Sequence, residues 1–533
     1  MYQSMLKPLF KRIKYIVTAV WVLAAFVIFL LMTFRLHPVP FSMFTTLIIL
    51  ATIYFSKAFP DWFQGYLFRR MSEIKSNPMI NYFRQRGFAP IQNEVFQERL
   101  EVEGTLPKDL NGMYVRNGPN PAFLPISYAY PFDGDGMLHA VYINGGYASY
   151  RNKYVETKGL KAERKAGYAL YGGLGRIIPP DPKLIGKHGD LGPIKNTAAI
   201  HILRLDKTFL ALYEAAPPYE VSTELETIGE WRPKYYKNKP FHMNAHTRRC
   251  PDSGHVYGFT YDLKPPYLTY YQFNTEGELI QHLPIKKDRP TMMHDFVLTK
   301  NYLVFFDCPA VFDTRELWTD EEMIQWREDL NTRVILVHRE THVTRSFEMD
   351  PFFVYHFVNG YEDEDELIVD YIRHETFTTG DKLHTDFAGL YRFKLNLKSE
   401  VFAHHLLFDR RLEFPRINEA YQTKPYRYLY APVKTEGHIK AFHALLKYDL
   451  KTRKAYMHQF EPHQEIDEAV FIPKSKGKGD EDSGYLGMFV YNARTNKSDF
   501  VLLDAKDVRK DPVAVVHLPH HVPHGLHGNW FVD

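Results

Sequence analysis

The sequence is poor in cysteine: its 533 residues include only Cys250 and Cys308. Two cysteines cannot form the disulfide framework of a small secreted domain, and this usage fits a reducing compartment. The chain also lacks an excess of either charge, since 66 basic residues stand against 63 acidic ones. Because no basic run is interleaved with aromatics, no nucleic-acid partner is expected. No Walker loop, dinucleotide fingerprint or nucleophile elbow occurs in a strand–helix context.

Aromatic residues and histidine are abundant instead. The chain has 36 Tyr, 39 Phe and 25 His and is 45% hydrophobic, which is ample for a large core in one large domain or two ordinary ones. Aromatics suit half-buried strands. With so many histidines, most must be ordinary core or surface residues, so a single histidine is weak grounds for a metal site.

The N-terminus carries two uncharged apolar runs, residues 15–34 and 41–56. The first is 20 residues long, enough for a helix of about 30 Å that crosses a bilayer. The second is shorter, and it either spans the bilayer or lies in its plane. A signal peptide is the alternative, but the first run is longer than usual and no small-x-small cleavage site follows. The sequence predicts a membrane anchor over residues 1–60 and a linker over 61–87.

Basic residues flank this pair of runs on both sides. Four of them precede the first run and four follow the second, with only Arg35 between the runs. The positive-inside rule then places both ends of a transmembrane hairpin, and the body that follows, in the cytoplasm. If the second run does not span, the body lies on the opposite side.

The body, residues 88–533, reads as all-β. Short segments rich in Tyr, Val, Phe and Ile recur about every 8–15 residues between turn signals such as PDSG and NTEG. Helices are expected only as insertions, near residues 161–170 and 320–329. More than twenty strands without a βαβ rhythm predict a sandwich array or a propeller, and no repeat signature chooses between them.

Four histidines lie in unusual settings: His246 in FHMNAHTRR, His294 in TMMHDFV, His356 in FVYHFVNGYED and His527 in HGLHGNWF. A buried imidazole needs a partner for each ring nitrogen, and a metal is one such partner. A backbone carbonyl is the commoner one for a lone core histidine. The separations of 48, 62 and 171 residues match no local zinc pattern, and an all-imidazole set suits Zn, Cu or Fe alike. The residues alone therefore indicate a polyhistidine metal site in a β protein.

The same segments resemble the carotenoid cleavage oxygenase family, which also holds stilbene-cleaving and retinoid-isomerising members. The resemblance runs from about Phe88 to Asp533. Its motifs include NGMYVRNGPNP, FDGDGMLHAV, LYEAAPPYEV, MMHDF, HFVNGYED, LEFPRIN and GLHGNWF. It implies a seven-bladed β-propeller with one Fe²⁺ per chain on its axis, held by His246, His294, His356 and His527. His242, His524 and the pair His404 and His405 fall on no ligand position of the family.

The resemblance also implies three glutamates that orient ligands. Glu214, Glu413 and Glu468 match the family's positions and would accept the second ring N–H of His294, His356 and His527, respectively. Such a contact fixes the tautomer and raises the basicity of the other nitrogen. Glu468 departs from the pattern, because Ala469 stands where a proline is expected.

The activity implied is dioxygenase cleavage of a C=C bond in a carotenoid or apocarotenoid by O₂, giving two aldehydes. No further catalytic residue is needed beyond the iron site, and a lipophilic polyene, O₂ and the membrane are the expected partners. A stilbene is the alternative substrate; Tyr128, Tyr130, Lys153 and Lys158 lie in roughly the region where related enzymes hold a phenol. A non-catalytic, membrane-tethered lipid-binding propeller is a third interpretation, and it conflicts with the complete histidine set.

Overall fold

The structure is a computed structural model that describes residues 85–532, except 175–176, 178–179, 186–189, 191–193, 235, 237–239, 314–321, 380–387, 436–440 and 475–478. The two apolar runs, residues 15–34 and 41–56, lie outside the described residues, so the expected anchor remains a prediction. Within the described part, no helix has the length and apolarity to cross a bilayer.

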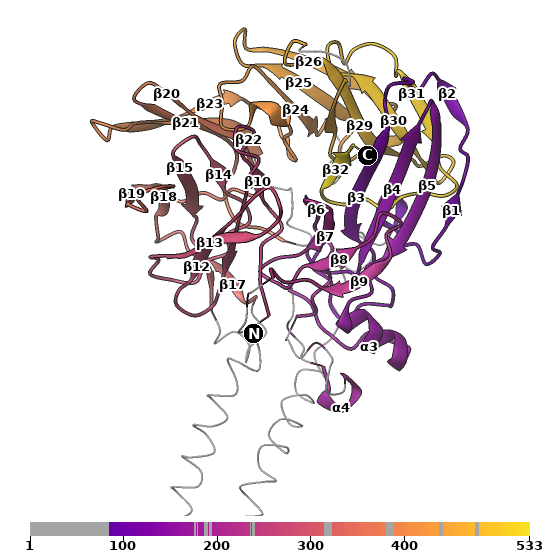
Figure 1. Cartoon of the computed structure of the whole chain (residues 1–533), viewed down its shortest axis with the longest axis horizontal. Helices are drawn as coiled ribbons and strands as arrows, with labels where there is room; N and C mark the ends of the chain where they lie inside the picture. The colour runs from indigo at the N-terminus through magenta and orange to yellow at the C-terminus, as the bar shows by residue number, and fades with distance from the viewer. Residues whose placement is uncertain are drawn as a thin grey trace, which may run out of the picture.

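The described residues form eight antiparallel sheets, of which seven are set around an axis as the blades of a propeller (Figure 1). Blade 1 has the order β1 (Phe96–Gln97), β5 (Tyr147–Tyr154), β4 (Gly136–Asn144), β3 (Gly112–Pro119) and β32 (Gly528–Phe531). Blade 2 consists of β6 (His201–Leu205), β7 (Thr208–Leu212), β8 (Tyr219–Val221) and β9 (Thr227–Glu230). Blade 3 consists of β10 (Arg248–Arg249), β11 (Val256–Tyr261), β12 (Leu268–Phe273) and β13 (Leu279–Ile285).

The remaining blades follow in chain order. Blade 4 consists of β14 (Val297–Leu298), β15 (Tyr302–Asp307), β18 (Thr332–His338) and β19 (Thr344–Met349). Blade 5 consists of β20 (Phe357–Asp363), β21 (Glu366–His374), β22 (Ala388–Asn396) and β23 (Phe402–Phe408). Blade 6 consists of β24 (Tyr428–Val433), β25 (Ala444–Asp449) and β26 (Lys454–Gln459). Blade 7 has the order β2 (Val102–Gly104), β31 (Ala514–His517), β30 (Lys497–Asp504), β29 (Gly484–Asn492) and β27 (Gln464–Ile466), with β28 (Val470–Pro473) also on β29.

The ring closes by mixing strands from the two ends of the described chain. Strand β32 pairs with β3 in blade 1, and β2 pairs with β31 in blade 7. Closure brings two glycine-containing motifs into contact, because a Cβ on Gly118 would lie only 2.6 Å from the Cα of Gly525. The glycines of RNGPNP and HGLHG therefore permit a backbone approach that no larger residue allows.

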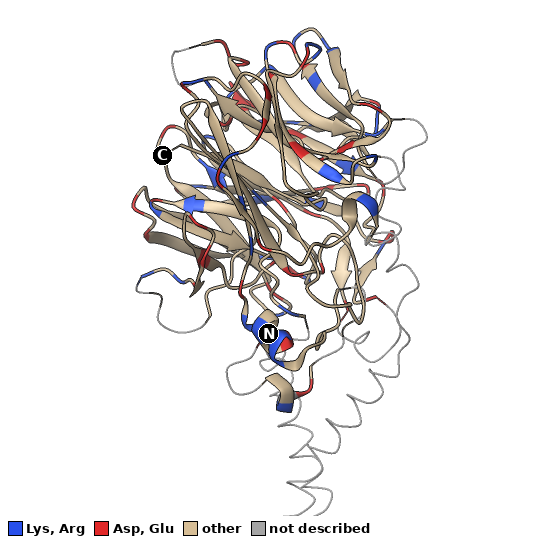
Figure 2. Ribbon diagram, turned by 90° about the vertical axis from the view of Figure 1, so that its right-hand side faces the viewer, with Lys and Arg blue, Asp and Glu red and all other residues tan. Residues whose placement is uncertain are grey.

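Side-chain alternation explains why the blades stack. Strand β13 reads partly buried, exposed, partly buried along its length, as an outer strand with one wet face does. Strands in the interior of a blade can be buried on both faces; β3 is buried at all eight positions. The largest core cluster gathers side chains from blades 2 to 5 around aromatics such as Phe259, Phe296 and Phe305. Figure 2 shows Lys and Arg interspersed with Asp and Glu along the blades.

Helices are few and short, as expected. Helix α3 (Lys158–Ala166) begins at Thr157, whose side chain accepts a hydrogen bond from Leu160 N, and ends at Gly167 in the left-handed conformation. The shorter elements are α4 (Pro182–Ile185), η2 (Arg86–Phe88) and η5 (Glu419–Tyr421). The expectation of a helix near residues 161–170 is thus met in part.

The expected helix at residues 320–329 is wrong in its described part. There the chain forms β17 (Ile324–Trp326), which pairs with β16 (Ala310–Phe312) in a two-stranded sheet. The run of charged helix formers around these residues favours a helix, but burial of Met323 and Ile324 against the core decides the conformation.

Candidate metal centre

The four candidate histidines stand where the chain enters the innermost strand of a blade. His356 and His527 directly precede β20 and β32, while His246 and His294 lie two and three residues before β10 and β14. Each inner strand starts near the axis, so four segments far apart in sequence end at one point. All four histidines are buried, with 4–7% of each residue exposed.

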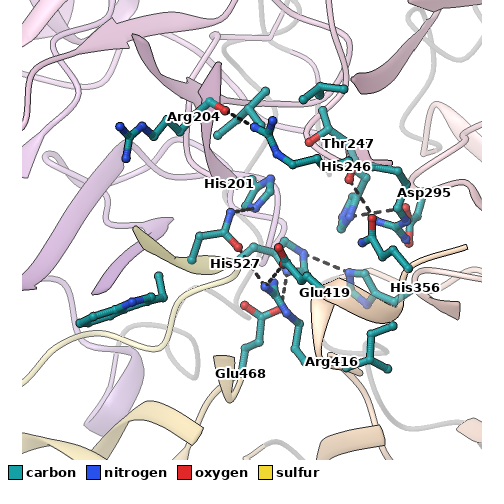
Figure 3. A pocket seen from close by; sticks show the side chains of 18 of the residues that line it. His201, Arg204, His246, Thr247, Asp295, His356, Arg416, Glu419, Glu468 and His527 are labelled. Atoms are coloured by element: carbon teal, nitrogen blue, oxygen red, sulfur yellow. Dashed lines mark hydrogen bonds and ion pairs between the residues drawn. The ribbon is translucent and has the colours of Figure 1, made fainter. Parts of the chain in front are cut away.

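Their Nε2 atoms face one another. His246 Nε2 lies 3.0 Å from His294 Nε2, and His356 Nε2 lies 3.1 Å from His527 Nε2. One nitrogen of each ring lies within 4.8 Å of those of the other three. For a metal–nitrogen distance of about 2.1 Å, two ligands at a right angle have nitrogens about 3.0 Å apart. The residues therefore fit a single metal ion with imidazole ligands at right angles; Figure 3 shows three of these histidines.

Three of the rings have a carboxylate at their second nitrogen. His356 Nδ1–H donates to Glu413 Oε2, and His527 Nδ1–H donates to Glu468 Oε1 at 2.9 Å. His294 Nδ1 lies 2.5 Å from Glu214 Oε1, in an ion pair that is bent away from the line of a good hydrogen bond. The structure thus brings together each pair that the resemblance implied.

The seven blades divide into two groups around this centre. Blades 1, 3, 4 and 5 carry the histidines. Glu214 follows β7 in blade 2, Glu413 lies on the segment that bridges to β24 in blade 6, and Glu468 lies between β27 and β28 in blade 7. Every blade of the described ring therefore contributes one side chain, either a ligand or the carboxylate that orients one.

Backbone strain accompanies two of these carboxylates. Ala215 and Phe414, which directly follow Glu214 and Glu413, have φ of 44° and 51°. The left-handed conformation is unfavourable for residues with a Cβ and costs on the order of 1–3 kcal/mol. In both places the left-handed residue turns the chain so that the side chain of the preceding glutamate is directed at the axis. An alanine and a phenylalanine are not residue types for which this role would be expected.

Burial and the carboxylates set the protonation of the rings. Burial and the neighbouring imidazoles hold the pKa of His246 well below its usual value. Burial also lowers the pKa of His527 to about 4, against the raising effect of Glu468. Burial acts in the same direction on His294, but Glu214 outweighs it and the pKa is raised. His246 and His527 are therefore neutral near pH 7, as ligation of a metal requires, whereas Glu214 favours the protonated form of His294.

The outer carboxylates are held in their charged form. Burial alone would raise the pKa of Glu413, but His356 and His374 hold it well below its usual value. Burial is likewise outweighed at Glu468, where Arg416 and His527 lower the pKa to about 2. Both glutamates therefore remain negatively charged throughout the pH range in which the histidines can bind a cation.

Charged and aromatic side chains both surround the centre. A cavity of about 460 Å³ opens beside His246, His356 and His527, and its wall includes Arg248 and Arg416. These two arginines form ion pairs: Arg248 contacts Asp295, and Arg416 contacts Glu468 and Glu419. Aromatic rings pack on the histidines: Phe132 and Tyr355 on His294, at 6.0 and 5.6 Å between ring centroids, and Phe414, which also lines the cavity, on His356 and His527.

Four further residues support the centre and were not foreseen from the sequence. His374 Nε2–H donates to Glu413 Oε1 at 2.8 Å, so Glu413 accepts from both His356 and His374. Arg416 contacts both Glu468 and the carbonyl of Gly528. His201 lies 2.9 Å from the carbonyl of Ala245 and Asp295 lies beside His246. Asp295 and Arg416 belong to the motifs MMHDF and LEFPRIN, but nothing in the motifs shows which side chain faces the axis.

The histidines that were set aside as ligands lie in other contacts. His524 is buried and donates to Asp467 at 2.6 Å and Glu465 at 2.8 Å; burial lowers its pKa, but these carboxylates raise it to about 9. His404 and His405 lie on β23, where His404 Nδ1 contacts Tyr371. His242 is partly buried and is not in the four-histidine group.

The residues in the region expected to hold a phenol have partners of other kinds. Lys153 pairs with Glu226 and Lys158 with Glu230, both on blade 2. Tyr130 packs edge-on against Phe88, with ring centroids 5.1 Å apart. These contacts give the two lysines partners of their own at the outer part of the propeller.

A propeller whose blades converge on four buried imidazoles defines a metalloprotein with a single axial centre. The family model of the retinal pigment epithelial membrane protein matches residues 88–532. The carotenoid 9,10(9′,10′)-cleavage dioxygenase 1 of Phaseolus vulgaris is 32% identical over 494 residues, which cover 85% of this chain and 90% of that protein. The apocarotenoid-15,15′-oxygenase of Synechocystis is 30% identical over 461 residues, covering 81% and 92%.

A solved structure agrees with these relatives. The lignostilbene dioxygenase of Pseudomonas brassicacearum superimposes with a TM-score of 0.77 at 25% identity, covering 85% of this chain and 98% of that one. The chain belongs to the retinal pigment epithelial membrane protein family, that is, the carotenoid oxygenase family. Its enzyme class is that of the non-haem iron dioxygenases that act on single donors.

Proposed function

We propose that this protein binds one Fe²⁺ per chain through His246, His294, His356 and His527 and cleaves a C=C bond of a carotenoid or apocarotenoid with O₂ to give two aldehydes. The observation that carries the proposal is the convergence of four buried Nε2 atoms within 4.8 Å. The curated relatives that act on carotenoids and apocarotenoids support the substrate class.

Iron fits the donor set. Four neutral imidazoles compensate none of a cation's charge, so a 2+ ion keeps its full Lewis acidity. When bound, Fe²⁺ supplies the activation of O₂ for addition across the double bond. Because no cysteine belongs to the group, and the ligands come from four separate blades, the centre does not resemble a structural zinc site with clustered ligands.

The chain's own residues hold the geometry and exclude other reactions. Glu214, Glu413 and Glu468 fix the tautomer of three rings so that each Nε2 faces the centre. The aromatic rings of Phe132 and Tyr355 pack nearly perpendicular to the ring of His294, and such apolar neighbours suit a conjugated chain that must lie beside the metal. No general acid or base is assigned, since cleavage to two carbonyl products leaves no proton to transfer.

A stilbene is the second candidate substrate, favoured by the match to a solved lignostilbene dioxygenase. Lys153 and Lys158 each form an ion pair with a glutamate of blade 2. Because the partner of each lysine is a glutamate, these contacts support the polyene instead. The substrate panel described below distinguishes the two.

We also propose that residues 15–34 and 41–56 tether the enzyme to a membrane, with the catalytic body on the cytoplasmic side. The support is the uncharged length of the first run and the basic residues outside both runs. A tethered enzyme can take a lipophilic polyene directly from the bilayer in which it dissolves.

Aerobic incubation of the iron-loaded protein with a panel of carotenoids, apocarotenoids and stilbenes tests the reaction, with mass detection of the aldehydes. Polyene-derived aldehydes are expected. His356→Ala should abolish iron binding and turnover, whereas His405→Ala, which changes an exposed histidine on β23, should keep both. Aldehydes from stilbenes alone would exclude the polyene proposal, and an active His356→Ala enzyme would exclude the metal assignment.

A further inference from the structure

His246 differs from the other three histidines because no glutamate among the described residues contacts its Nδ1. The three blades without a ligand histidine supply Glu214, Glu413 and Glu468, and these contact the other three rings. The carboxylate beside His246 comes instead from a blade that already carries a ligand. Within the part of the chain that the structure describes, the one carboxylate within 4.0 Å of this ring is Asp295.

Asp295 directly follows His294, and its side chain is 1% exposed. Its Oδ2 accepts hydrogen bonds from Arg248 Nη2 at 2.6 Å and from Phe357 N at 2.9 Å. Its Oδ1 accepts one from Phe296 N at 2.8 Å. A buried carboxylate that accepts three donors, one of them a guanidinium, is held firmly in one orientation.

These contacts connect three of the four segments that carry ligands. Asp295 itself is one residue beyond His294, Phe357 is one residue beyond His356, and Arg248 is two residues beyond His246. Blades 3, 4 and 5 are therefore joined through a single side chain at the level of the histidines. A displacement of this carboxylate would move three ligands together.

The free acceptor position of Asp295 lies toward the fourth partner. A carboxylate has about four lone-pair positions, two on each oxygen, and Oδ1 uses only one of its two. Oδ1 is also the atom closest to His246, at 3.6 Å from Nδ1. This distance is too long for a hydrogen bond, but it places a negative charge beside the ring N–H that must remain protonated when Nε2 binds a cation.

We infer that Asp295 is the positioning residue for His246, the counterpart of the three glutamates, and that it sets the tautomer and tilt of this ring as well as the spacing of three ligand segments. Arg248 tempers its charge, and Figure 3 shows Asp295 beside His246. The inference rests on the metal binding that the proposed function assigns to the four histidines.

Cobalt binding tests the inference without any turnover. Co²⁺ takes imidazole ligands, and the absorption bands of its d electrons report the geometry of those ligands. The metal-free full chain is titrated with Co²⁺ in competition with a chelator, as wild type, Asp295→Asn and Asp370→Asn. Asp370 is the matched control, because it is also buried and bound by an arginine, Arg392, at 2.7 Å, but lies on β21.

Asp295→Asn should lower the affinity for Co²⁺ roughly 10–100-fold, as loss of an outer partner commonly does, and should shift the absorption bands. Asp370→Asn should lower the unfolding temperature of the metal-free protein and leave both cobalt readouts unchanged. An Asp295→Asn protein that is destabilised like the control but binds Co²⁺ as wild type, with the same spectrum, would reduce Asp295 to a structural carboxylate and overturn the inference.

A second variant covers the case in which Asp295→Asn does not fold. Arg248→Gln removes the guanidinium charge, but Phe296 N and Phe357 N still hold the carboxylate of Asp295. The negative charge of Asp295 then acts on His246 without the opposing positive charge of Arg248. Its affinity for Co²⁺ should equal or exceed that of wild type, and a tenfold loss would overturn the inference. A wild-type protein that binds no Co²⁺ or Fe²⁺ would instead refute the metal centre itself, which distinguishes the two failures.

Discussion

Replacing Glu413 separates the charge of an outer carboxylate from its hydrogen bonds. Its Oε2 accepts from His356 Nδ1 and from Phe414 N, and its Oε1 accepts from His374 Nε2 at 2.8 Å. A glutamine in this place can keep its oxygen at the Oε2 position, so that both of the first two donors retain an acceptor. Its NH₂ group then faces His374, whose ring can change tautomer and accept. Glu413→Gln therefore keeps the orientation of His356 and removes only the negative charge.

The expected magnitudes differ for the two obvious substitutions. Glu413→Gln should lower the affinity for Fe²⁺ by about tenfold, the lower end of the usual effect of an outer partner, which corresponds to about 1.4 kcal/mol. Glu413→Ala leaves the two buried ring donors of His356 and His374 without an acceptor. At about 1–3 kcal/mol for each, the free energy of unfolding of the metal-free protein should fall by about 2–6 kcal/mol.

Chelator competition for Fe²⁺ and urea unfolding of the metal-free proteins measure the two effects. Glu362→Gln is a matched control, because Glu362 also accepts three bonds, from Thr299 and Asn301, on the strand that follows His356. It lies six residues along β20, about 20 Å away at strand rise, and should not change the affinity for Fe²⁺. Wild-type affinity in Glu413→Gln, or a loss of stability equal to that of Glu413→Ala, would refute the reasoning.

Three further predictions concern regions outside the metal ligands. Removing residues 1–60 should release the protein from membranes in a carbonate wash and leave its iron content unchanged; a carbonate-resistant truncated chain would place the anchor elsewhere. Lys153→Ala and Lys158→Ala should leave the rate on polyenes unchanged, whereas a rate loss on stilbenes in either variant would show that the lysine holds a phenol. The pKa of His524 is raised to about 9, so its stabilising contribution, on the order of 3 kcal/mol, is complete below about pH 6.5 and is lost as the pH rises through 9. Urea unfolding at pH 6.5 and pH 9.5 should show this fall in the free energy of unfolding in wild type but not in His524→Gln. An equal fall in the two proteins would disprove the raised pKa.

The sequence predicted the ligand candidates better than their arrangement. Motifs around His246, His294, His356 and His527 marked all four, but separations of 48, 62 and 171 residues say nothing about convergence unless the strands are known to start at one axis. The roles of Glu214 and Glu413 depend on left-handed residues after them, and the backbone conformation of an alanine or a phenylalanine is not legible in sequence. Asp295 lies within the motif MMHDF, but the motif does not predict its role, because hydrogen bonds from blades 3 and 5 fix the direction of its side chain.

Errors in secondary structure have the same physical origin. Residues 320–329 contain good helix formers, yet Ile324–Trp326 forms a strand because an edge was available at Ala310–Phe312 and because Met323 and Ile324 gain burial there. Local propensity is worth tenths of a kcal/mol per residue, whereas burying one large apolar side chain is worth about 1.5–3 kcal/mol. The tertiary term therefore decides wherever the two conflict.

The topology makes the metal centre depend on closure of the ring. His527 directly precedes β32, and β32 completes blade 1 by pairing with β3, more than 400 residues earlier in the chain. Three of the ligands lie on the consecutive blades 3, 4 and 5, so the fourth reaches them only when the chain's last strand is in place. A metal that binds all four rings binds only the closed form, and ligation of the native state at 1,000 times its dissociation constant stabilises that state by about 4 kcal/mol. A bound metal should therefore also hold β32 in place against β3.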